Sequence, residues 1–195
     1  MKIRARIGFA AMVVLAVVVA GCGLKGMREV PADRVTVKPP ADQAAIVFMR
    51  SAATAATTSL FELSSSEQPR FIGLLVQNTR MVYLTAPGRT RFMVVGRSAS
   101  FLDAELAPGK TYEVAIVLGD GVEEHFRLVP ASRVAPADSR AIEDCRATCK
   151  WVENTDRSET WARGQSSSIQ RKKAEYLPKW ERRPNRPTLA ASDGR

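Results

Sequence analysis

The stretch FLDAELAPGKTYEVAIVL, residues 101–118, decides the fold of this chain. Apolar and polar residues alternate in both halves of the stretch, which is typical of β-strands that bury one face. An Ala-Pro-Gly turn separates the halves, with Pro108 fixing φ at about −65° and Gly109 accepting a positive φ. The pattern therefore predicts two strands that meet at a hairpin corner.

The same pattern continues on both sides of this stretch. Apolar or alternating segments occupy residues 45–49, 58–64, 71–76, 81–84, 91–95 and 124–129. Turn residues separate these segments: 77–80 suit a hairpin, 86–88 repeat the Ala-Pro-Gly corner, and 119–121 are Gly-Asp-Gly. Because no helical period interrupts them, we expect a mainly β fold, an antiparallel β-sandwich of about eight strands over residues 44–135 with its polar face in solvent.

The remaining residues, 136–195, change to a helical period. One helix is predicted from a cap at Asp138 or Ser139 through Val152. A second is predicted over residues 169–177, because Pro178 would end or kink it there. The sandwich is therefore expected to carry a C-terminal helical extension.

Composition and motifs limit the kinds of chemistry that this chain can perform. Its 195 residues are 45% hydrophobic and 25% charged with a net charge of +9, which indicates one globular domain and excludes wholesale disorder. The single histidine, His125, excludes a poly-His metal site, and no Gly-x-Ser-x-Gly motif supplies a nucleophile. The sequence Gly109-Lys110-Thr111 lacks the earlier glycine of a phosphate-binding loop, since Ala104 stands there. We therefore predict no catalytic residue, metal or cofactor.

The N-terminus has the pattern of an export signal. Lys2, Arg4 and Arg6 precede an uncharged, mostly apolar stretch at 7–20, which is too short to span a bilayer but suits a signal peptide. The following Val19-Ala20-Gly21-Cys22 resembles the lipobox of bacterial lipoproteins. This resemblance implies a signal peptide at 1–21 and lipidation of Cys22. An ordinary secretory signal, or a short membrane anchor with an incidental thiol at Cys22, is the alternative.

The lipobox resemblance also implies a location. Acyl chains on Cys22 would hold the protein at a membrane, and the Gly-, Pro- and charge-rich residues 22–43 would form a tether. Gly23 stands where an Asp commonly retains such proteins at the inner membrane. The expected location is therefore the bacterial cell envelope, at the outer membrane and facing the periplasm.

A second resemblance covers residues 44–135. Ala45-Ile46-Val47-Phe48, the stretch 102–112 with its Gly-Lys-Thr-Tyr strand entry, and Phe126-Arg127-Leu128-Val129-Pro130 occur in an order similar to that of PEGA-related domains. These are small bacterial envelope domains of unknown function. The resemblance implies a lipoprotein β-sandwich and supplies no catalytic motif.

Cys145 and Cys149 lie on one face of the first predicted helix. Residues four apart on a helix have Cα atoms about 6 Å apart, within the range of a disulfide, and an oxidising periplasm favours their pairing. A structural disulfide is the favoured interpretation. Two reduced thiols, or redox, metal or intermolecular chemistry, are the alternatives, although the spacing matches neither a thioredoxin-type motif nor a zinc site.

Positive charge concentrates near the C-terminus, where residues 154–195 contain 10 basic and 5 acidic residues interspersed with aromatic ones. Contact with an anionic surface is one interpretation, through Arg171, Lys172, Lys173, Lys179, Arg182 and Arg183. The favoured alternative is that the aromatic residues pack against the sandwich while the charges stay solvated. Export argues against a nucleic-acid partner.

Together these patterns predict a membrane-anchored envelope lipoprotein that acts as a binding or assembly module. Its expected partners are membrane lipid, through acylated Cys22, and another envelope protein or an anionic envelope polymer. The alternative is an accessory subunit or hydrolase of the cell envelope whose site the sequence does not reveal.

Overall fold

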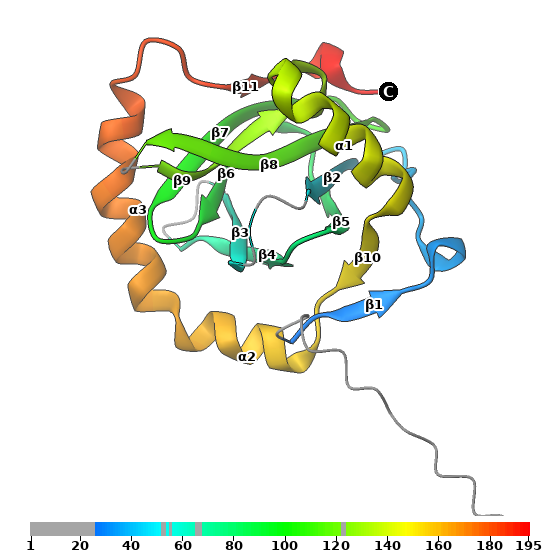
Figure 1. The fold of residues 1–195 in the computed structure, drawn as a ribbon, viewed down its shortest axis with the longest axis horizontal. Helices are drawn as coiled ribbons and strands as arrows, with labels where there is room; N and C mark the ends of the chain where they lie inside the picture. Colours follow the sequence, from blue (N-terminus) through cyan, green and yellow to red (C-terminus); the bar gives the residue numbers. More distant parts are fainter. Residues whose placement is uncertain (1–25, 52–53, 55, 65–67, 122–123) are drawn as a thin grey trace, which may run out of the picture.

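The computed structural model describes residues 26–51, 54, 56–64, 68–121 and 124–195, in which strands form two facing sheets (Figure 1). In spatial order, the six-stranded sheet contains β1 (Arg28–Val30), β10 (Lys150–Glu153), β5 (Thr79–Thr85), β2 (Ala44–Arg50), β8 (Thr111–Gly121) and β9 (Glu124–Pro130). The five-stranded sheet contains β11 (Thr188–Leu189), β7 (Ala99–Leu106), β6 (Gly88–Val95), β3 (Thr58–Leu63) and β4 (Arg70–Leu75).

A strand lies at each of the eight predicted positions, β2 to β9, but the predicted antiparallel arrangement is wrong. Both sheets are mixed, because β2 pairs with β8, β10 with β5, and β11 with β7 in parallel. Alternation along a strand reports which side chains are buried and carries no information about the direction of the neighbouring strand.

The two Ala-Pro-Gly corners connect the sheets instead of forming hairpins. Each leads from a strand of one sheet to a strand of the other, β5 to β6 and β7 to β8. Gly88 and Gly109 have φ values of 112° and 70°, so the predicted need for a positive φ is confirmed. The predicted hairpin at 77–80 likewise crosses between sheets, and residues 119–121 belong to β8 and form no turn.

The main core lies between the two sheets. Its larger members come from alternate positions of the central strands: Ile46, Phe48, Leu60, Ile72, Phe92, Leu102, Tyr112, Val114 and Leu128. Strand β2, whose residues 44–49 are all apolar, is buried along its whole length. Leu118 shares the alternation of Val114 and Ile116 on β8 but is 42% exposed, and the β8–β9 register shifts just beyond it.

Helices pack on the outer faces of both sheets, so the fold is mixed α/β. The prediction that the outer face of the sandwich lies in solvent is therefore wrong where the helices cover it. Helix α1 (Pro136–Thr148) packs Ile142 on Val47 and Met49 of the six-stranded sheet. Helix α3 (Ser166–Glu181) packs on Phe101 of the other sheet. Several outward positions under the helices, such as Val47, Met49 and Phe101, are thus apolar too, which a search for alternation overlooks.

The predicted limits of the terminal regions also change. Helix α1 ends at Thr148 instead of Val152, because residues 150–153 form β10 beside β5. Helix α2 (Asp156–Gly164) follows, and α3 continues past Pro178 to Glu181. Strands β10 and β11 complete the two sheets, so residues 136–195 are more than an appended extension. Within the expected tether 22–43, residues 28–30 pair with β10 as β1.

Candidate functional site

A groove lined by arginines lies between β9 and the chain that connects α3 to β11. Its volume is about 620 Å³. It is lined by Arg127, Leu128, Val129, Pro130, Arg133, Arg183, Pro184, Asn185, Arg186, Pro187 and Thr188. Four of these residues are arginines, and no acidic residue lines the groove within the described parts of the chain. The groove is therefore a concentrated positive site on a surface of mixed charge.

Local sequence explains why these side chains meet. Arg127 points away from the core because its strand neighbours Phe126 and Leu128 point into it. On the other wall, α3 ends at Glu181 and the chain continues as Arg-Arg-Pro-Asn-Arg-Pro, residues 182–187. The two prolines fix φ and prevent this segment from continuing the helix. A stiff loop thus holds its arginines opposite β9.

Arg133 is held in one orientation by the C-terminal residues. Its two terminal nitrogens donate to the two carboxylate oxygens of Asp193 at 3.1 and 2.9 Å, and one of them also donates to the carbonyl oxygen of Thr188. Asp193 is itself fixed, because it accepts a hydrogen bond from the backbone N–H of Ala190 at 2.7 Å. The guanidinium is therefore preorganised at the groove, with 48% of the side chain exposed.

Arg186 is positioned by the end of α3. Its Nη1 donates to the carbonyl oxygen of Glu181 at 2.6 Å, and its guanidinium lies 5.4 Å from the ring centre of Trp180. Its Nε lies 3.9 Å from Asp103, whose carboxylate accepts a shorter bond of 2.6 Å from Arg91. Because Arg91 already engages Asp103, the charge of Arg186 is only partly compensated.

The chemistry of the groove follows from its donors. A guanidinium presents a planar set of N–H donors that matches the oxygens of phosphate or carboxylate, and it stays charged throughout the physiological pH range. Arg127, Arg133, Arg183 and Arg186 come from three separate segments and line the same groove. This arrangement suits binding of an anion.

Of the six basic residues predicted to contact an anionic surface, Arg183 lines this groove. Lys172 instead donates to the carbonyl oxygens of Gly96 and Arg97, both at 2.5 Å, and so ties α3 to the β6–β7 turn. Burial lowers the pKa of the Lys172 ammonium; the charge of Glu175 acts to raise it, and that of Arg171 to lower it further.

The other predicted cations lie along α3 or just after it. The Lys179 ammonium is 5.2 Å from the ring centre of Tyr176. Arg171 and Arg182 are exposed, and Lys173 is half-buried. The groove thus shares one residue with the predicted set. Sequence reasoning missed Arg127, Arg133 and Arg186; the run at residues 182–187 was the available signal for the last of these.

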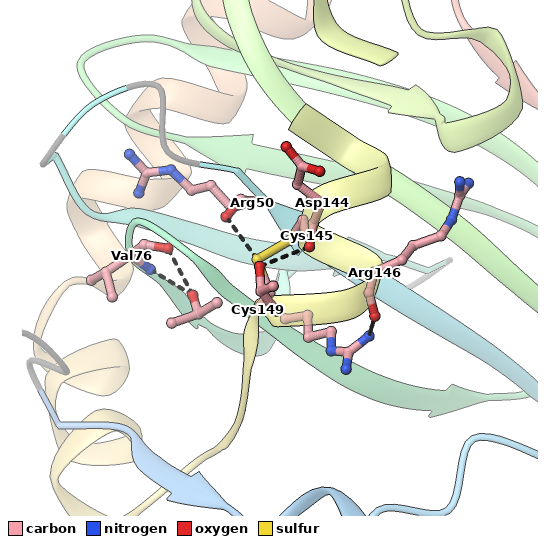
Figure 2. Close-up of a disulfide and its surroundings, with 9 residues drawn as sticks. Arg50, Val76, Asp144, Cys145, Arg146 and Cys149 are labelled. Carbon is pink, nitrogen blue, oxygen red and sulfur yellow. Dashed lines mark hydrogen bonds between the residues drawn. A yellow bond between two sulfur atoms is a disulfide. The ribbon is translucent and has the colours of Figure 1, made fainter. Parts of the chain in front are cut away.

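Cys145 and Cys149 form a disulfide, as predicted. Figure 2 shows it where α1 meets the six-stranded sheet, with the Cys149 sulfur 3.7 Å from the carbonyl oxygen of Arg50. Beside it, Arg80 donates to the carbonyl oxygen of Arg146 at 2.5 Å in the last turn of α1. Both cysteines of the disulfide are buried, so the bond fixes the junction between α1 and β10 and is not accessible from solvent.

Removal of this disulfide is expected to lower the free energy of unfolding, although less than removal of a disulfide that closes a long loop. The closed loop contains only five residues, for which the loop-entropy relation gives about 2 kcal/mol. Urea unfolding of the double variant Cys145→Ala and Cys149→Ala should show a loss of that size. A variant as stable as the oxidised protein would contradict this expectation, and mass analysis with and without reductant would verify the bond.

His125, the one conventional general base in the sequence, lies in positive surroundings. Its ring is half-buried against Phe126, with ring centres 4.1 Å apart, and its Nδ1 accepts a 3.5 Å hydrogen bond from the N–H of Arg97. Burial, followed by the charges of Arg97, Arg50 and Lys172, lowers the pKa of the imidazole. These contacts account for an imidazole that packs against Phe126 and favours its neutral form.

Arg50 is a buried cation with structural contacts. Its guanidinium donates to the carbonyl oxygens of Leu75 at 2.7 Å and Thr54 at 3.0 Å, and lies 4.7 Å from the ring centre of Phe126. Burial lowers the pKa of Arg50 to about 10. These bonds attach the end of β2 to β4 and to the chain before β3.

The predicted lipidation site, Cys22, and the signal peptide lie outside the described residues. Within the described part of the chain, no helix has the length and apolar character needed to cross a bilayer. The same part contains no group of three or more His, Cys, Asp or Glu side chains placed to hold a metal ion.

Comparison with known proteins adds no relative. Neither a protein-family model nor a curated protein sequence matches this chain.

Proposed function

We propose that this protein is a lipid-anchored module of the bacterial cell envelope that binds an anionic envelope polymer in its arginine groove. The observation that carries the proposal is the convergence of Arg127, Arg133, Arg183 and Arg186 on one groove of about 620 Å³. The polymer would present phosphate or carboxylate groups, which guanidinium pairs recognise.

The anchor rests on the N-terminal sequence. The basic residues before position 7, the apolar stretch 7–20 and the Val-Ala-Gly-Cys motif support acylation of Cys22 after removal of residues 1–21. More than one acyl chain would hold the protein firmly at the membrane. Gly23 after the cysteine supports the outer membrane, with the folded part in the periplasm.

The fold is compatible with a non-catalytic module. Strands β2 to β9 form two facing sheets, which supports a β-sandwich similar to PEGA-related envelope domains, extended here by β1, β10 and β11. On this proposal the helices shape the outer faces of the sandwich. Helix α3 also positions one wall of the groove, because the loop that follows it carries Arg183 and Arg186.

Substitution in the groove tests the binding function. The double variant Arg183→Gln and Arg186→Gln is expected to bind tripolyphosphate or hexaglutamate at least about tenfold more weakly, because each lost charge-assisted contact is worth about 1.5–3 kcal/mol. Titration calorimetry at low and high salt would measure this, and salt should weaken wild-type binding. The two probes separate phosphate from carboxylate recognition.

Arg182→Gln is the matched control for that experiment. Arg182 is adjacent to Arg183 in sequence and exposed, but it does not line the groove, so its substitution should change the affinity little. An equal loss in the control and the double variant would indicate nonspecific attraction. That result, or no binding of either probe at low salt, would disprove the proposed function of the groove.

A further inference from the structure

The first described residues are fixed against helix α2. The Thr155 hydroxyl, which also caps this helix, donates a hydrogen bond to the carbonyl oxygen of Gly26. Met27 is buried in the main core, and β1 begins at Arg28. The point at which the chain enters the fold is therefore the N-terminal end of α2.

Helix α2 lies at one end of the molecule. Figure 1 shows it opposite the end that carries α1, β11 and the C-terminus. The arginine groove is formed by β9 and by the chain between α3 and β11, so it lies away from α2. The two surfaces are therefore separated by the body of the fold.

A short covalent link connects this end to the proposed lipid. This step rests on the lipid anchoring proposed above. Four peptide units separate Cys22 from Gly26, and an extended chain spans at most about 3.6 Å per residue, so their Cα atoms are at most about 14 Å apart. An acylated Cys22 in the membrane therefore keeps the α2 end at the bilayer surface.

The exposed face of α2 suits that position. Ser158 and Ala162 are buried against the body, whereas Arg157, Trp161 and Arg163 are exposed. Trp161 is 39% exposed, although its ring also packs near Phe71. Tryptophan favours the headgroup layer of a bilayer, and basic side chains are attracted to anionic lipid phosphates.

Helix α2 also carries two carboxylates. Asp156 is exposed in the first turn, where a carboxylate interacts favourably with the N-terminal end of the helix dipole, and Glu159 is half-buried. Arg163 donates to the Thr160 hydroxyl at 2.9 Å. The exposed positions of α2 therefore combine one large aromatic ring and two guanidinium groups with one exposed carboxylate.

We infer that α2 is a membrane-contact surface, with Trp161 in the headgroup layer and Arg157 and Arg163 on anionic phospholipid headgroups. This contact orients the molecule, because it directs the arginine groove away from the anchoring bilayer. The groove then meets ligands in the periplasm instead of the lipids that hold the protein.

Tryptophan quenching tests the contact. The acylated full-length protein would be reconstituted into vesicles of phosphatidylcholine and phosphatidylglycerol whose acyl chains carry bromine. Trp151 and Trp180 are buried inside the fold, so the expected loss of emission on bromination comes from Trp161. The Trp161→Phe variant should show no such loss. Equal quenching of wild type and variant, or no quenching of either, would overturn the inference.

Charge variants and flotation separate the possible failures. Arg157→Gln with Arg163→Gln should reduce quenching in vesicles with phosphatidylglycerol, whereas Arg182→Gln, after α3, should leave it unchanged. Equal effects of these variants would overturn the lipid-specific contact. Protein that floats with vesicles without Trp161 quenching retains its anchor and disproves only the orientation. Protein that does not float disproves both the anchor and this inference.

Discussion

Glu62→Ala is expected to lower the free energy of unfolding by about 3–5 kcal/mol, because it removes the centre of a buried network of polar groups. Glu62 on β3 is 3% exposed. Its carboxylate accepts hydrogen bonds from Arg70 at 3.1 Å, from Tyr83 and Thr85 at 2.8 Å each, and from Thr90 at 3.0 Å.

The network joins the two sheets, which explains the large expected effect. Tyr83 and Thr85 belong to β5 of the six-stranded sheet, whereas Glu62 belongs to the other sheet. Without the carboxylate, the tyrosine and threonine hydroxyls lose their common acceptor at a site that water reaches poorly, whereas the Arg70 side chain is 57% exposed and can turn to solvent. Each unpaired group then carries its own desolvation cost.

Urea unfolding of three variants measures the effect. Glu105→Ala, on the exposed side of β7, is the matched control and should change stability by no more than about 0.5 kcal/mol. Glu62→Gln keeps the shape but places an amide N–H₂ against hydrogen-bond donors, so an intermediate loss is expected. A loss in Glu62→Ala as small as that in Glu105→Ala would show that the network is not stabilising.

The same carboxylate gives stability a defined pH dependence. Burial acts to raise the pKa of Glu62, but hydrogen bonds from Thr85, Tyr83 and Arg70 prevail and lower it below its usual value. The unfolded chain therefore binds a proton at higher pH than the folded protein. The contribution of Glu62 is fully present above the unfolded pKa of about 4.3 and is lost as pH falls through the folded pKa. Wild type should lose more stability than Glu62→Gln on acidification.

Local pattern located strands β2 to β9, but it missed β1, β10 and β11 and failed for the arrangement of the strands. The pattern of residues 101–118 predicted two strands separated by a turn, and both are present. The glycines of both Ala-Pro-Gly turns also have the expected positive φ. The sequence did not distinguish a hairpin from a crossing between sheets, because both need the same local turn. It also did not reveal that residues 150–153 leave the helical period to pair with β5, since that choice depends on a distant strand.

The groove and the buried network were hidden for a similar reason. Arg127, Arg133 and Arg186 lie up to 59 positions apart and converge only through the pairing of the sheets. Glu62 occupies an inward position of β3, where a charged residue breaks the apolar pattern. Its hydrogen-bond partners come from three other strands, so the sequence around Glu62 does not identify them. The disulfide was predictable because Cys145 and Cys149 are close in sequence. The helical geometry predicted for both is wrong, because Cys149 lies just after α1 in an extended conformation and the two Cα atoms are 4.6 Å apart.

Trp180→Ala is expected to lower the free energy of unfolding by about 3–5 kcal/mol and to weaken anion binding at the groove. Trp180 is 2% exposed and packs on Phe101 of β7, with ring centres 5.7 Å apart. The guanidinium groups of Arg91 and Arg186 lie 4.9 and 5.4 Å from the centre of its ring. Loss of the ring thus leaves a cavity under α3 and removes a surface on which a groove arginine rests.

Two tryptophan variants separate the packing of Trp180 from its effect on the groove. Trp180→Phe keeps an aromatic surface beneath Arg186, so it should retain most anion affinity while losing part of the stability. Trp161→Ala, at a side chain that is 39% exposed, should lower the unfolding free energy less than Trp180→Ala and leave tripolyphosphate binding intact. Urea unfolding and calorimetry on the same preparations measure both quantities. If folded Trp180→Ala bound tripolyphosphate as wild type does, the aromatic support would not position Arg186, and the loop of residues 182–187 would have to hold this wall of the groove without it.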